Sequence, residues 1–123
     1  MGAKRVDDLV VFQLANELRR RIHEITATET IRADRRFCDQ IRDAASSSTR
    51  NVAEGFGRYG HREFAQFLSI ARGSVFELQD QLRDGVSREY WKASDVDDLH
   101  ALCNRTIAAI THLIRYLKTH KDR

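Results

Sequence analysis

The chain contains no proline, and only six of its 123 residues are glycine. Proline interrupts a helix because it lacks a backbone N–H and clashes with the preceding turn, so long helices meet no such break here. Neither an apolar signal segment nor a run of about 18 apolar residues is present, which indicates a cytoplasmic protein with no membrane partner. The length and the lack of low-complexity linkers indicate one domain over residues 1–123.

The chain also has few cysteines and lacks the residue spacings of common metal and catalytic sites. Cys38 and Cys103 are the only cysteines, fit no Cys-x-x-Cys metal spacing and fall on expected helices, which favours buried reduced thiols. His23-Glu24 lacks the second histidine of a zinc protease, and no Glu-x-x-His pair of a di-iron bundle occurs. We therefore expect no enzyme activity, no cofactor, no metal and no small-molecule substrate.

Charge of both signs is plentiful, with 21 basic and 18 acidic residues and a net charge of +3. Lysine occurs four times, at Lys4, Lys92, Lys118 and Lys121, so 17 of the 21 basic residues are arginine. Arginine makes bidentate contacts with phosphate and carboxylate, which favours an interface or nucleic acid as its use. Compositional drift in a GC-rich genome explains the same excess equally well.

Apolar residues recur at steps of three and four, and no segment alternates with a period of two. The spacing predicts four helices over residues 9–28, 34–56, 61–84 and 95–118. Short links between such helices favour an all-α fold, an antiparallel up-down-up-down four-helix bundle.

Glycine and serine positions give the expected helix ends. We expect Gly55 and Gly57 to stop the second helix through a left-handed turn, and Gly85 to end the third. Ser94 is the expected cap of the fourth helix. Four aromatic side chains could stack on nucleic-acid bases: Tyr59, Tyr90, Trp91 and Tyr116. Trp91 beside Tyr90 is better explained as closing one end of the core, so Tyr59 and Tyr116 remain as stacking candidates.

The third expected helix carries a second face besides its apolar stripe. At 100° per residue, Ala65, Ser69, Gly73 and Phe76 fall on one face largely opposite the core. A glycine inside a helix costs about 1 kcal/mol relative to alanine, so Gly73 favours close approach of another helix. We therefore predict a homo-oligomer interface here. A tolerated surface glycine beside one exposed phenylalanine is the alternative.

The link between the second and third helices gathers small and polar residues, namely Asn51, Glu54, Gly55, Gly57 and Arg58. Hydrogen bonds from Asn51, Glu54 and Arg58 that lock this corner are the favoured interpretation. An interface role and a ligand role remain as alternatives.

Arginine groups are the candidate nucleic-acid contacts. One set is expected near the link between the first two helices, and it comprises Arg19, Arg20, Arg21, Arg32, Arg35 and Arg36. Arg58 and Arg62 are expected at the opposite end. Repetition by symmetry would multiply either patch. The alternative is a solvated surface balanced by the acidic residues.

The central segments resemble a known bacterial family. They read Gln-Ile-Arg, then Asn-Val-Ala-Glu-Gly-Phe-Gly-Arg, then Glu-Phe-Ala-Gln-Phe-Leu-Ser-Ile-Ala-Arg-Gly-Ser, at 40–42, 51–58 and 63–74. With the opening Asp-Leu-Val-Val-Phe-Gln-Leu-Ala at 8–15, this pattern is similar to the four-helix-bundle proteins linked to intervening sequences in 23S rRNA genes. Phe12 replaces the family's usual tryptophan, and Ser48-Thr49 replaces its frequent Ile-Pro.

The resemblance implies a left-handed bundle that assembles as a homopentamer, without an established biochemical activity. A related fold serves diversity-generating retroelements as a basic pentamer that engages a reverse transcriptase and nucleic acid. We predict a non-enzymatic, oligomeric interaction scaffold. The alternative is an RNA- or nucleic-acid-binding accessory protein, and a steep fall of affinity with salt would distinguish it.

Overall fold

The computed structural model describes residues 3–120, and within them every regular element is helical. The five α-helices are α1 (Val10–Ile25), α2 (Glu29–Ala33), α3 (Arg35–Phe56), α4 (His61–Ser87) and α5 (Asp97–Thr119). Short 3-10 turns, η1 (Val6–Asp8) and η2 (Ala93–Val96), precede α1 and α5. The predicted all-α class is therefore confirmed.

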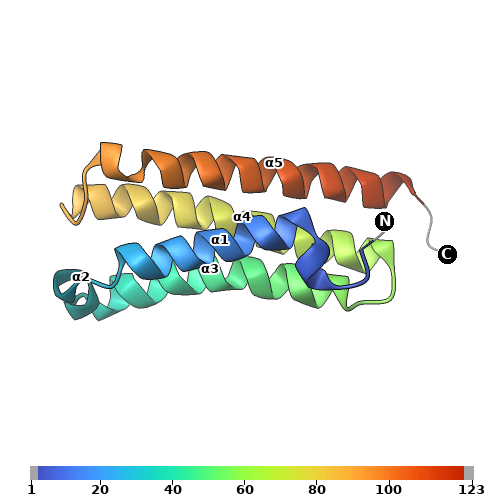
Figure 1. Cartoon of the computed structure of the whole chain (residues 1–123), viewed down its shortest axis with the longest axis horizontal. Coiled ribbons are helices and arrows are strands. Elements are labelled where there is room, and N and C mark those ends of the chain that lie inside the picture. The colour runs from blue at the N-terminus through green and yellow to red at the C-terminus, as the bar shows by residue number, and fades with distance from the viewer. Residues whose placement is uncertain (1–2, 121–123) are drawn as a thin grey trace.

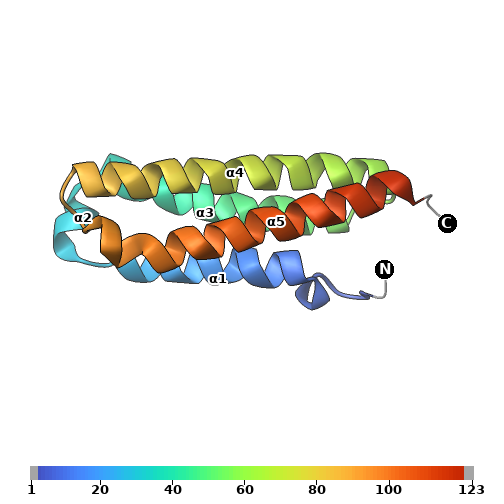
Figure 2. The same ribbon diagram turned by 90° about the horizontal axis from the view of Figure 1, so that it is seen from above.

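Four long helices lie side by side, and each runs opposite to the one before it (Figure 1). α3 packs between α1 and α4, while α5 packs between α4 and α1, so the four surround one interior. The start of α1, the α3–α4 link and the end of α5 lie together at one end of the molecule, and α2 lies at the other (Figure 2).

All four long helices contribute fully buried aliphatic side chains to one core, with relative exposures of 0–1%. Burial of each such side chain contributes about 1.5–3 kcal/mol, which is the main driving force for this arrangement. The largest are Leu18, Ile22, Ile41, Leu68, Leu78, Leu82, Leu99 and Ile110.

The first helix ends at Ile25 rather than at the predicted residue 28. The Thr26 hydroxyl donates to the Ile22 carbonyl (2.7 Å) and accepts a hydrogen bond from Arg42 Nε (2.8 Å), and the side chain is buried there. The chain then turns and forms α2, which places Ile31 in the core. The periodic pattern did not predict α2 because a five-residue helix carries too few apolar positions to establish a period.

The second expected helix ends at Phe56 as predicted, with Gly57 next, but the left-handed turn expected there and the stop expected at Gly85 were wrong. No described glycine has a positive φ; Gly57 follows α3 in a right-handed conformation, with φ −76°. Gly55 lies inside α3 and α4 continues past Gly85 to Ser87, because both glycines serve close packing. A Cβ on Gly55 would lie 2.8 Å from both Phe64 Cδ1 and Phe67 Cβ.

Tyr90 and Trp91 close the α2 end of the core, as predicted. Trp91 Nε1 donates to the Leu82 carbonyl (2.9 Å), and the Phe37 ring packs against both aromatic rings, at 5.1 and 5.8 Å. Ser94 does not cap α5, because it lies within η2, and the residue that precedes α5 is Val96.

Candidate functional site

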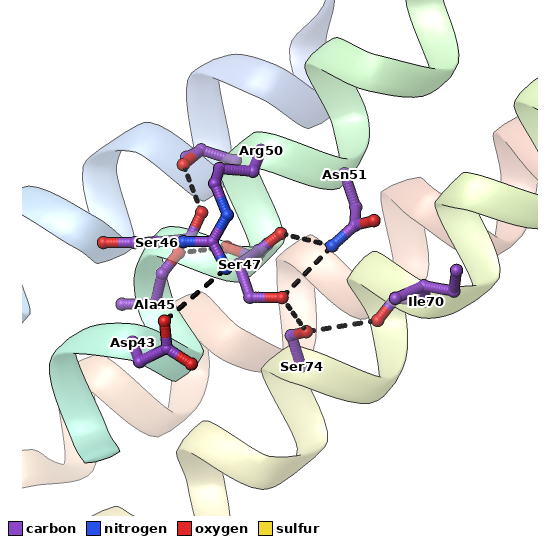
Figure 3. A network of polar contacts seen from close by, with 10 residues as sticks. Asp43, Ala45, Ser46, Ser47, Arg50, Asn51, Ile70 and Ser74 are labelled. Carbon is purple, nitrogen blue, oxygen red and sulfur yellow. Dashed lines mark hydrogen bonds and ion pairs between the residues drawn. The ribbon is translucent and has the colours of Figure 1, made fainter. Parts of the chain in front are cut away.

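A network of polar side chains around Ser47 and Ser74 joins α3 to α4 midway along the two helices (Figure 3). Asn51 Nδ2 donates to the carbonyl (2.9 Å) and hydroxyl (3.1 Å) oxygens of Ser47. The Ser47 and Ser74 hydroxyls are 2.9 Å apart, and Ser74 donates to the Ile70 carbonyl (3.2 Å). Asn51 therefore acts between the helices through Ser47 and not at the α3–α4 corner, because it lies more than a helical turn before the end of α3.

The corner itself is held by Arg58. Its guanidinium pairs with Glu54 at 2.6 Å and Glu63 at 3.9 Å, and it lies over the Phe67 ring, 5.0 Å from the centroid. These charged side chains are about half exposed, so each pair adds at most about 1 kcal/mol. Arg58 thus has acidic partners already and is less available to a phosphate than its position in the sequence indicated.

The outer face of α4 carries an exposed apolar strip, which we define as Ile70, Gly73 and Phe76. Ile70 and Phe76 are 53% and 54% exposed, and a Cβ on Gly73 would meet no atom within 4 Å. Ser69 is exposed beside them. Ala65, predicted on this face, is buried at 4% exposure because it lies at the edge of the helix that faces the core.

Ile70 was not among the residues predicted on this face. Its spacing of three residues from Gly73 was the available signal, since residues three apart on a helix are neighbours.

The arginine set near α2 divides into paired and unpaired members. Arg20 pairs with Glu17 and Glu24, at 2.5 and 2.7 Å, and these contacts raise its pKa. Arg21 is half-buried beside Leu14 and Asp98. Four others are exposed and make no ion pair with any residue from 3 to 120: Arg19, Arg32, Arg35 and Arg36.

Positive charge also accumulates between α1 and α3. Partial burial, followed by the charges of Arg42 and Arg19, lowers the pKa of His23. Arg42 is held there by its bonds to the Thr26 hydroxyl and, at 3.4 Å, the Thr26 carbonyl. The lowered pKa of His23 therefore reflects burial first, and the two neighbouring guanidinium groups add to it.

At the opposite end, a hollow of about 740 Å³ opens between the first turns of α4 and the last turn of α5. Its lining residues are His61, Arg62, Ala65, Gln66, Ser69, Leu117, Lys118, Thr119 and His120. Four of these are basic types and none is acidic. Sequence reasoning identified Arg62 but not Lys118, because only the packing of α4 on α5 brings them together.

The described part of the chain also bears on metal binding, membrane crossing and the state of the cysteines. Between residues 3 and 120, no three His, Cys, Asp or Glu side chains gather in a metal-binding group. None of the helices in that range is long and apolar enough to cross a bilayer. Cys38 and Cys103 are both buried free thiols, as predicted.

An all-α fold of long antiparallel helices, with an exposed apolar strip on α4, defines a class of small helical proteins. Residues 7–112 match the family model described as 23S rRNA-intervening sequence protein, and the chain belongs to this family. The resemblance inferred from the central motif is thereby confirmed. Comparison with curated proteins gives no match.

Proposed function

We propose that this protein is a non-enzymatic interaction scaffold of the cytoplasm: an up-down-up-down four-helix bundle that assembles through the outer face of α4. The subunit number proposed, five, follows the resemblance to the family. The observation that carries the proposal is the open surroundings of Gly73 within its own chain.

A glycine in the interior of a 27-residue helix lowers its stability by about 1 kcal/mol relative to alanine. Gly85 and Gly55 offset this through tight contacts with neighbouring side chains, but Gly73 has no such neighbour. A contact outside the monomer supplies the missing packing reason. Ile70 and Phe76, each about half exposed on either side, provide the apolar surface for that contact.

A closed ring requires the apolar strip to meet a different surface of the neighbouring copy, since a strip that met its own equivalent would give a two-fold dimer. Val10 at the start of α1 is 61% exposed, and no Cα atom of α1 lies within 8 Å of one in α4. Exposed apolar surface is thus present on a helix away from the strip, which is compatible with a heterologous contact.

Sedimentation equilibrium tests the proposal. Wild-type protein should sediment at a multiple of 14.2 kDa, while Gly73→Arg and Phe76→Glu should give the single-chain mass. Arg115→Glu, at an exposed position on α5, is the matched control and should keep the assembled mass. A wild-type protein at 14.2 kDa, or variants that stay assembled, would refute the scaffold.

Nucleic-acid binding, including action beside a reverse transcriptase, is the second candidate. Three exposed arginines near the α2 end favour it, since they make no ion pair within residues 3–120: Arg32, Arg35 and Arg36. Assembly would repeat this group in every subunit and so strengthen contact with a polyanion. We expect RNA affinity to fall steeply with salt and Arg35→Ala/Arg36→Ala to reduce that slope. Undetectable RNA binding at low salt would exclude this candidate.

A further inference from the structure

The α3–α4 link presents an aromatic ring to solvent. Tyr59 lies in this four-residue link and is 100% exposed, whereas Tyr90 and Trp91 pack against Phe37 at the other end. A tyrosine ring normally buries its apolar body while its hydroxyl reaches a polar partner. A completely exposed ring therefore leaves both faces open to a flat ligand.

The basic hollow begins two residues after Tyr59, at His61. His61 Nδ1 donates to the His120 carbonyl (2.9 Å), which ties the first residue of α4 to the residue after α5 and fixes the two walls of the hollow. Arg62 and Lys118 stand on these two walls, and both are exposed.

The nearest acidic side chain in the sequence does not cancel this charge. Glu63 follows Arg62 directly but does not line the hollow, and its carboxylate lies 3.9 Å from the Arg58 guanidinium. Among residues 3–120, the lining of the hollow places cations on two walls and includes no carboxylate, which favours an anion there. Because Arg62 lies on α4 and Lys118 on α5, a group with several acceptor oxygens, such as phosphate, can contact both.

We propose that Tyr59 and this hollow form a binding site for single-stranded nucleic acid. An unpaired base stacks on the Tyr59 ring, and a neighbouring phosphate contacts Arg62 and Lys118. Stacking on an exposed aromatic beside a basic groove tolerates any base and requires that the base be unpaired. The site deepens the nucleic-acid candidate, but it lies at the opposite end from Arg32, Arg35 and Arg36, so each can fail without the other.

Fluorescence anisotropy with a labelled uridine oligomer of about 12 nucleotides, at about 50 mM salt, tests the site. Tyr59→Ala should weaken binding roughly 5- to 100-fold, and Tyr59→Phe should stay within about twofold of wild type because the ring remains. Arg62→Ala and Lys118→Ala should each lower the slope of log affinity against log salt by about 0.7. A duplex of the same length should bind more weakly.

Arg35→Ala/Arg36→Ala is the matched control at the far end, and it should leave the effect of Tyr59→Ala unchanged. Wild-type affinity in Tyr59→Ala, or equal loss in Tyr59→Phe, would overturn the site. Loss only in the far-end control would move binding to the α2 end and keep the nucleic-acid candidate. Absence of binding at low salt would remove both.

The hollow also includes Ser69, which lies beside the apolar strip, so a second copy is the competing occupant. Sedimentation of the Arg62→Ala and Lys118→Ala proteins decides between them. Unchanged assembled mass with reduced RNA affinity supports the nucleic-acid site. A fall to the single-chain mass would show that the hollow is a subunit contact and would overturn the proposal.

Discussion

Gly85 lies directly against the indole ring of Trp91. A Cβ added to Gly85 would come within 2.2 Å of Trp91 Cζ2 and 2.3 Å of Cε2. The indole is held in this place by its hydrogen bond to the Leu82 carbonyl and by the ring of Phe37. The glycine therefore permits the α4–α5 link to fold back onto α4 and cover the end of the core.

Gly85→Ala should lower the free energy of unfolding by about 1–3 kcal/mol, because the indole must move and leave its packing. Urea unfolding of the variant measures this. Gly73→Ala in the same helix is the control, since its Cβ meets nothing in the chain and should raise monomer stability by about 1 kcal/mol. Equal effects of the two substitutions would contradict the assigned role of Trp91.

Gly55 and Gly57 form a second matched pair. Gly55→Ala should destabilise the protein by about 1–3 kcal/mol, because its Cβ would lie 2.8 Å from Phe64 and Phe67 and push α3 from α4. At Gly57 the nearest atoms would lie at 3.6 Å and φ is −76°, so Gly57→Ala should be nearly neutral. Thermal unfolding at one protein concentration compares them. A severe loss in Gly57→Ala would show that the corner needs glycine for another reason.

Stability at acidic pH should depend on Asp34. The hydrogen bond from the Tyr90 hydroxyl, aided by the Phe37 amide and by Arg88, lowers the pKa of this carboxyl below its usual range. A group with a depressed pKa in the folded state stabilises the protein above the unfolded value, about 3.9, and this contribution disappears as pH falls through the folded pKa.

Asp34→Asn should therefore be less stable than wild type near neutral pH, and the difference should shrink as pH falls below about 4. Asparagine remains a good N-cap, so the substitution tests the charge rather than the cap of α3. Urea unfolding between about pH 2.5 and about pH 7 measures the effect. Asp39→Asn, exposed on α3, is the control. A pH-independent difference would refute the assigned contacts.

Cys103 should be chemically silent in the native state. Burial raises the pKa of this thiol to about 12, and the thiolate is the reactive form. In a Cys38→Ala protein, DTNB should label Cys103 only after urea unfolds the chain. Rapid labelling in buffer would show that α5 opens locally or that the thiol is accessible.

Sequence periodicity was sufficient for the four long helices because their apolar stripes are extended and regular. It placed the end of α3 correctly at Phe56 but ended α4 too early, because Gly85 was assigned a turn-forming role, whereas this glycine serves close packing against Trp91 that no local pattern records. The same limit applies to α2, whose single buried Ile31 gives no period.

For the candidate surfaces too, helix geometry predicted some residue positions and packing decided the others. Helical geometry correctly placed Ser69, Gly73 and Phe76 on an exposed face, but the 100° rule left Ala65 at its margin, and packing decided that it is buried. Asn51 was expected to help lock the corner, but it bonds to Ser47 in the preceding turn of α3, and Ser47 in turn contacts Ser74 of α4.

The sequence by itself determined the all-α class, the positions of the long helices, and the family, because these depend on periodicity and on residue order. Only the tertiary structure decided which arginines are neutralised, which glycines touch a neighbour, and that Arg62 and Lys118 share one hollow. The physical reason is that charge pairing and packing depend on distances between segments far apart in the chain, and these distances exist only once α3, α4 and α5 have packed together.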